Sequence, residues 1–115
     1  MRTPVEVNER YQQFLTDIAA TKLIYAAIGN DGNFAAWSYD ENQEPLVLFW
    51  SKPEFAQEAI DSKFSGYELC EIAFEDFVVL LNDLEKQNFF IAVNWYPEMI
   101  GLELSSKTLL QQIVS

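Results

Sequence analysis

The chain has 115 residues, half of them hydrophobic, and its 18 acidic and 7 basic side chains give a net charge of -11. This length and apolar content predict one folded domain spanning residues 1–115. Phosphate and anionic lipid repel so acidic a chain, which argues against nucleic acid and membranes as partners. The sequence has no histidine and one cysteine, which excludes an intramolecular disulfide and a cysteine-rich zinc site.

The N-terminal residues are polar, and the longest apolar run, residues 46–50, has the length of a strand rather than of a membrane span. We interpret the single Cys70 as a small, buried core residue and not as a reactive thiol. A lone buried cysteine suits a reducing compartment. We therefore expect a cytoplasmic protein.

The first half of the chain predicts one helix and three strands. Apolar side chains recur with helical spacing over residues 7–21, which predicts an amphipathic helix. Residues 23–28 and 34–39 are apolar runs separated by a Gly-Asn-Asp-Gly-Asn turn, so they predict a β-hairpin. Residues 46–50 are apolar on both faces, which is typical of a strand at the centre of a sheet.

The second half alternates helices with strands. Ser51, Pro53 and Glu54 indicate a helix start with Ser51 as its N-cap, and Gly66 follows that helix. Further along, the pattern predicts a strand over residues 67–73, a helix over 74–87, a buried strand over 89–95, a short strand over 102–104 and a last helix capped by Ser105 or Ser106.

This order of elements predicts an α+β fold class. The architecture we expect is a single domain with a mixed, mostly antiparallel sheet of about five to six strands and helices packed on it. The runs at 46–50 and 89–93 are the expected central strands, because both of their faces are apolar.

The sequence contains no recognisable catalytic, cofactor-binding or metal-binding motif. Nucleophilic catalysis through histidine is excluded by composition. The glycines at positions 29, 32, 66 and 101 fit neither of the common phosphate-loop motifs. Residues 30–33 lack the ligand spacing of a calcium loop. We therefore expect no catalytic residue, no cofactor and no metal ion.

Aromatic residues are numerous, with nine Phe, five Tyr and three Trp. Most of them are expected in the core, but tyrosine and tryptophan also suit half-exposed interaction surfaces. The candidates for such a surface are Tyr25, Trp37, Tyr39, Trp95 and Tyr96. The hairpin of residues 23–39, at the margin of the sheet, would present it to a partner. The competing interpretation buries Tyr25 and Trp37 beneath the first helix.

Residues 37–41 and 45–56 resemble the family catalogued as domain of unknown function 2750, a group of short acidic bacterial proteins. The motif is a Trp or Phe before Ser-x-x-Glu, represented here by Trp50 and Ser51 to Glu54. The leading helix and the ending also fit, so the resemblance covers nearly the whole chain. It implies a fold and no particular reaction.

The second half is also similar to the domain of the enhanced-serine-sensitivity protein, which has the same order of strands and helices. Asn94 would match an asparagine of that domain, whereas Trp95, Tyr96 and Pro97 depart from its usual Asn-Pro. Neither resemblance supplies a catalytic residue.

We interpret the chain as a non-enzymatic protein-interaction module with an unknown protein partner, a second copy of the chain being one candidate. The alternative is an acidic inhibitor or immunity-type protein that neutralises a basic partner, and its support is the net charge. Loss of binding with added salt would favour the alternative. The acidic residues also have a simpler interpretation, as a solvated surface that keeps the protein soluble.

Overall fold

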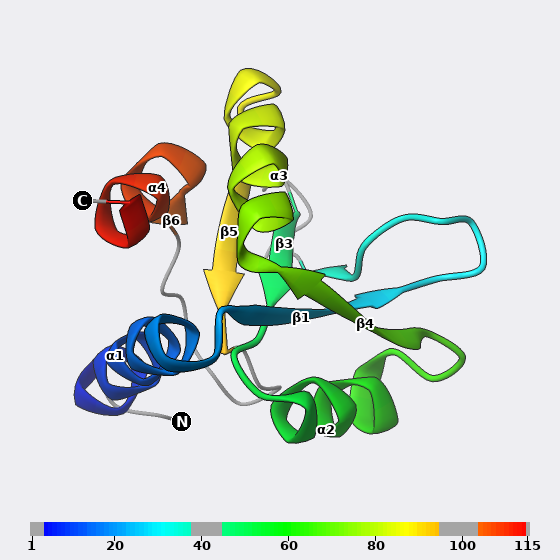
Figure 1. Cartoon of the computed structure of the whole chain (residues 1–115). Coiled ribbons are helices and arrows are strands. Elements are labelled where there is room, and N and C mark those ends of the chain that lie inside the picture. Colours follow the sequence, from blue (N-terminus) through cyan, green and yellow to red (C-terminus); the bar gives the residue numbers. More distant parts are fainter. Residues whose placement is uncertain (1–3, 38–44, 95–103, 115) are drawn as a thin grey trace.

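The structure, a computed structural model, describes residues 4–37, 45–94 and 104–114. Helices and strands alternate in the described segments in the order that the sequence predicts. The helices are α1 (Pro4–Thr21), α2 (Pro53–Lys63), α3 (Phe74–Lys86) and α4 (Ser106–Val114). The strands are β1 (Leu23–Ile28), β2 (Ala36–Trp37), β3 (Leu46–Phe49), β4 (Glu68–Ala73), β5 (Phe90–Val93) and β6 (Leu104–Ser105). Figure 1 shows their arrangement, with α1 and α4 lying on the same side of the molecule.

The strands form two sheets. One is the antiparallel pair β1–β4, and the other has the order β2-β3-β5-β6, with β3 and β5 parallel at its centre. An isolated bridge between Tyr25 and Trp50 joins the two sheets, and a second one, between Ile28 and Phe34, spans the turn that follows β1. The α+β fold class and the central placement of residues 46–50 and 89–93 are confirmed. The division of the strands between two sheets is a feature that the sequence pattern does not reveal.

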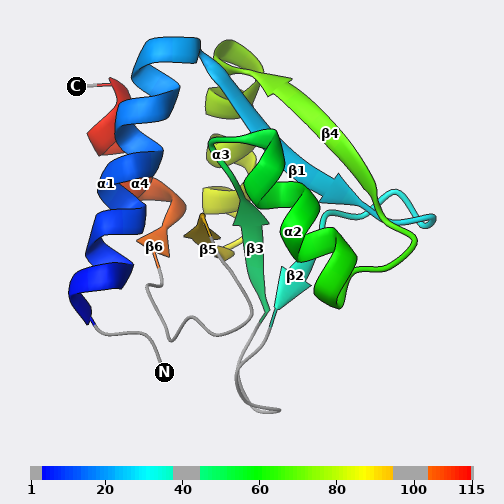
Figure 2. The ribbon, with the colours of Figure 1, turned by 90° about the horizontal axis from the view of Figure 1, so that it is seen from below.

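Helices cover both faces of the central strands, because neighbouring residues of a strand point to opposite faces. One core contains the β3 and β5 residues Val47, Phe49, Ile91 and Val93, together with buried side chains of α1, α3 and α4. The other contains Leu46, Leu48, Trp50 and Ala92, together with buried side chains of α2. Figure 2 shows α2 in front of the strands and α3 behind them, with α1 along one side.

The predicted hairpin turn forms, but its strands do not pair along their length. Gly29 N–H donates to the Asn33 carbonyl at 3.0 Å, and Ala35 N–H donates to the Ala27 carbonyl at 2.8 Å. Beyond that point β2 pairs with β3, and β1 pairs with β4 along all six of its residues. β4 therefore lies beside β1 on the side away from the hairpin, while β2, the second strand of the predicted hairpin, is at one end of the four-stranded sheet.

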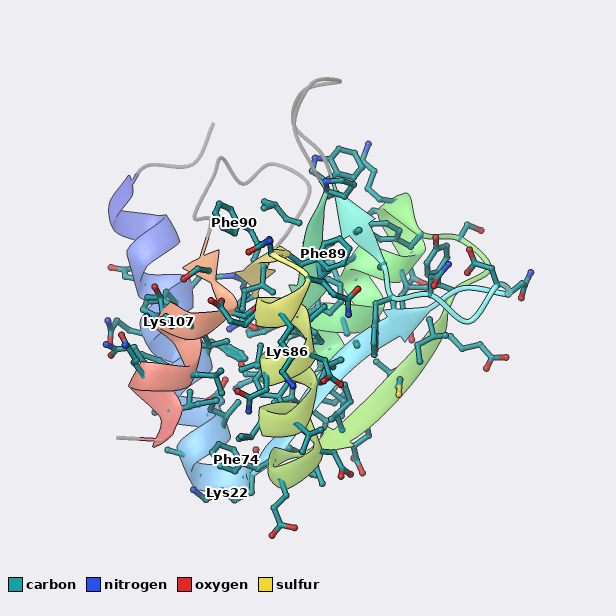
Figure 3. All side chains as sticks on the ribbon, turned by 90° about the horizontal axis from the view of Figure 1, so that it is seen from above. Lys22, Phe74, Lys86, Phe89, Phe90 and Lys107 are labelled. Atoms are coloured by element: carbon teal, nitrogen blue, oxygen red, sulfur yellow. The ribbon has the colours of Figure 1, made fainter. Side chains whose placement is uncertain are left out.

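Two buried positions predicted from the sequence are more exposed than expected. Cys70 is only half-buried, because it lies on β4 rather than in the core. Phe90, the first residue of β5, is 49% exposed. Figure 3 shows Phe89 and Phe90 at the end of α3 that is remote from Phe74 and Lys22. Among the described residues, no helix combines the length and the apolar character that crossing a membrane requires.

Candidate functional site

A buried polar cluster lies where the parallel strands β3 and β5 end. Ser51 follows β3 and Asn94 follows β5, and they are 2% and 0% exposed. Sheets with parallel strands commonly place their functional residues at the carboxyl ends of those strands. This position makes the cluster the first candidate for a reactive site.

Asn94 is the centre of the cluster. Its Oδ1 accepts the Ser51 backbone N–H at 2.8 Å, and its Nδ2 donates to the Arg10 carbonyl at 3.2 Å. In return, Arg10 Nε donates to the Asn94 carbonyl at 3.0 Å. Asn94 has a φ of 50°, a left-handed conformation that asparagine tolerates better than most residues. One residue therefore ties α1 to the ends of two strands.

Ser51 bonds to the polar cluster and does not cap α2. Its Oγ donates to Asp17 Oδ2 of α1 at 2.6 Å. The N-cap of α2 is instead Lys52, which makes no side-chain capping bond, and Pro53 follows it in the first turn. The predicted Ser51 cap was wrong because a carboxylate from a distant part of the chain takes the hydroxyl. At the other end of the chain, Ser105 does cap α4, with its Oγ accepting Thr108 N–H at 3.1 Å.

The polar groups of the cluster form hydrogen bonds with one another. Throughout the described residues, no buried side-chain nitrogen or oxygen lacks a hydrogen-bond partner. The Ser51 hydroxyl lies beside a carboxylate, but the hydroxyl is buried. The sequence has no histidine that could act as a general base. The same part of the chain contains no group of three or more side chains able to hold a metal ion. The hydrogen bonds of the cluster join α1 to the ends of β3 and β5.

The structure describes two of the five residues predicted for an interaction surface, and both lie against the same core. Tyr25 and Trp37 are half-buried and pack against the core that contains α2. Trp37 meets Phe64 edge-on, with ring centroids 6.4 Å apart. They do not lie beneath α1, whose Phe14 and Ile18 belong to the core on the other face. The remaining candidates, Tyr39, Trp95 and Tyr96, lie outside the described residues.

Tyr25 lies among acidic side chains. Its hydroxyl donates to Glu71 Oε1 of β4 at 3.4 Å. Desolvation raises the pKa of Tyr25 above its ordinary value, and the negative charge of Glu71, the hydrogen bond to Glu71 and the charge of Glu54 raise it further. On the α2 side of the β1–β4 pair, Tyr25 therefore lies near two carboxylates, one from β4 and one from α2.

We expect Tyr25 to ionise above pH 10.0, its ordinary pKa, and Glu71→Gln to lower that pKa toward the ordinary value. Because the folded-state pKa is the higher one, the neutral phenol stabilises the fold below pH 10 and this contribution is lost as pH rises through the folded pKa. Ultraviolet difference titration of the wild type against Tyr25→Phe isolates this group. An unchanged Tyr25 titration in Glu71→Gln would contradict the assignment.

Within the segments that the structure describes, the exposed large apolar residues differ from Tyr25 and Trp37. Leu69 of β4 is 40% exposed and Val79 of α3 is 61% exposed, in addition to Phe90. A sequence signal for β4 exists, because charged residues are common on edge strands and Glu68 and Glu71 flank Leu69. The sequence alone does not show which predicted strand occupies the edge.

Comparison with known proteins gives one family. The family model described as protein of unknown function (DUF2750) matches residues 11–113. No curated protein matches the chain. The match spans most of the chain and covers Asp17, Ser51 and Asn94 of the polar cluster as well as the β1–β4 pair.

Proposed function

The chain belongs to the DUF2750 family, whose description assigns no activity, and we propose that this member is a non-enzymatic protein-interaction module. One observation carries the proposal. β4 is a six-residue strand at the end of its sheet, it has β1 as its sole partner among the described strands, and its Leu69 is exposed. Edge strands of this kind are ready sites for pairing with another chain unless they are covered.

The polar cluster supports the non-enzymatic part of the proposal. Its most reactive group, the Ser51 hydroxyl, is buried and donates to Asp17. A nucleophile has to be reachable by its substrate and activated by a base of matched pKa. The burial of the Ser51 hydroxyl keeps it out of reach of a substrate in the arrangement described above. The expected cytoplasmic location is also part of the proposal, and it rests on composition.

A second function, an acidic inhibitor that neutralises a basic partner, is favoured by the charge of the same surface. Glu71 and Glu54 both act on Tyr25, so carboxylates from β4 and α2 lie close to one another. A partner held mainly by charge would dissociate steeply as salt is added. A partner held by backbone pairing and apolar contact would show a shallower dependence on salt.

We expect a photo-crosslinking amino acid placed at position 69 to capture a specific protein partner in cells. The reason is that Leu69 lies on the exposed edge strand, where an interacting chain would pass within reach of its side chain. Mass spectrometry of the adducts identifies the partner and the crosslinked segment.

The matched control places the same amino acid at position 79. Val79 is also an exposed apolar residue, but it lies on α3. Adducts that form equally from positions 69 and 79, or from neither, would contradict an interaction site at β4. Repeating the capture at increasing salt separates the two candidate functions.

A further inference from the structure

We propose that β4 binds an extended, positively charged segment of a partner protein, which adds to the β1–β4 pair as a further strand. This inference rests on the proposed function and gives it a binding mode and a partner chemistry. It follows from the directions of the backbone groups on β1 and β4 and from the side chains between them. Figure 2 shows β4 outside β1, on the side of the sheet away from α1.

The hydrogen bonds of β1 show which of its residues face which neighbour. Tyr25 N–H donates to the Trp50 carbonyl, and Trp50 N–H donates to the Tyr25 carbonyl, both at 2.8 Å. The Ala27 carbonyl accepts from Ala35 N–H. Backbone groups of successive residues point to opposite sides of a strand. The residues of β1 at positions 24 and 26 therefore turn their backbone groups toward β4.

The register between β1 and β4 shows which residues of β4 turn their backbone groups toward β1. Ile72 and Cys70 lie opposite positions 24 and 26, so their backbone groups face β1. The backbone N–H and C=O groups of Leu69 and Glu71 consequently point away from β1, toward the outer edge of the sheet. Ala73 N–H points the same way, while its carbonyl lies at the N-cap of α3, where it begins the helical bonding.

The backbone groups of β4 that are available for pairing lie within a short segment. Tyr67 N–H donates to the Phe64 carbonyl at 2.9 Å, so the turn before β4 uses that group. The Glu71 carbonyl accepts a long contact from Cys70 Sγ at 3.8 Å, and a carbonyl oxygen has a second lone pair for another donor. The edge from Leu69 to Ala73 thus matches one strand of ordinary short length.

The side chains of β4 at this edge indicate which kind of peptide segment would bind there. Leu69 and Glu71 lie two residues apart and so share the face of β4 on which Tyr25 meets Glu71. An added strand with an apolar residue opposite Leu69 and a lysine or arginine opposite Glu71 would complement both. The nearby Glu54 adds to the attraction for a cation.

A second copy of the chain is a poor occupant of the same edge. Pairing β4 with its own copy places two strands that carry Glu68 and Glu71 side by side, and like charges across a strand pair are unfavourable. Each copy also carries a net charge of -11. Charge therefore favours a basic partner over a homodimer at this edge.

The test uses the full chain and a labelled, end-capped peptide of sequence Thr-Lys-Thr-Val-Thr-Lys-Thr. The sequence is the same in either direction, so both parallel and antiparallel addition are sampled. Fluorescence anisotropy at low salt should detect binding of this peptide, and no binding of the version with glutamate in place of lysine. Glu71→Lys should weaken binding by about tenfold and Glu71→Gln by about threefold, from the size of cross-strand charge pairs.

Two N-methylated peptides test the strand geometry, since their composition and charge are identical. Methylating the amides of alternate residues blocks bonding on one side of the peptide, so one isomer can add only antiparallel to β4 and its complement only parallel. The isomer limited to antiparallel addition should bind more tightly, because parallel pairing is less stable per residue. Equal binding by both isomers would overturn the proposal in favour of plain charge attraction. No binding by any of the basic peptides would overturn it as well.

Leu69→Pro tests the edge from the protein side. Proline removes an N–H that points outward, so it should abolish peptide binding while the chain remains folded, and Leu69→Ala should retain most of the binding. If Leu69→Pro unfolds the chain, the peptide isomers still decide the question. Sedimentation that reveals a dimer broken by Leu69→Pro would overturn the proposal. If position 69 captures a partner but no basic peptide binds, the proposed strand addition is wrong, whereas the proposal that the protein is an interaction module still stands.

Discussion

Replacing Asn94 with alanine should lower the free energy of unfolding by about 3–5 kcal/mol. The change leaves the buried Ser51 N–H without its partner, which costs about 1–3 kcal/mol, and removes one of the hydrogen bonds that the Arg10 carbonyl accepts, which costs about 1 kcal/mol more. Alanine at a φ of 50° adds about 1 kcal/mol of backbone strain. Urea denaturation followed by tryptophan fluorescence measures the loss.

The control for this prediction is Asn94→Gly. Glycine removes the same hydrogen bonds but tolerates a positive φ, so Asn94→Gly should be more stable than Asn94→Ala by roughly 1 kcal/mol. This difference separates backbone strain from hydrogen bonding. A loss below about 1 kcal/mol in both variants would show that the cluster does not lock α1 to the sheet.

Phe49→Ala should destabilise the protein to a similar degree, by about 4 kcal/mol. Phe49 is fully buried on β3, and its ring centroid lies 5.0 Å from that of Phe77 on α3 and 5.8 Å from that of Phe34. The substitution removes both aromatic contacts and leaves a cavity between the sheet and α3. Thermal unfolding in a calorimeter gives the enthalpy and the shift in Tm.

Two further variants make the Phe49 result interpretable. Phe49→Leu retains most of the apolar volume and should cost about 1 kcal/mol. Val79→Ala removes an apolar group from an exposed position on α3 and should change stability by no more than about 0.5 kcal/mol. If Phe49→Ala resembled Val79→Ala, the assignment of Phe49 to the core would be wrong.

The polar cluster shows why its residues could not be assigned from the sequence. The pattern around Ser51 is a sound helix start, and only the fold reveals that Asp17 takes its hydroxyl. Asn94 was noticed through a family resemblance, with no physical reason to connect it with Arg10. Hydrogen bonds of this kind join residues 34, 43 and 84 positions apart, and no local spacing encodes them.

The predicted interaction surface also depends on contacts between distant segments, which local sequence does not show. Tyr25 and Trp37 were selected by residue type, and the structure places both in the half-buried layer beside α2. Leucine is among the residues most often buried, so composition does not single out Leu69 as an exposed residue. Its exposure follows from the position of β4 at the end of its sheet, which is a property of strand order and not of composition.

The order of helices and strands was readable from the chain, because the spacing of apolar residues along a helix or a strand depends on neighbours a few positions away. The central place of β3 and β5 was readable for the same reason, since only a strand covered on both faces is apolar on both. Strand partners are different, because the free energy of pairing comes from contacts between distant segments. Tertiary structure alone therefore decided that β1 pairs with β4, that Ser51 bonds to Asp17 and that β4 is left at the edge.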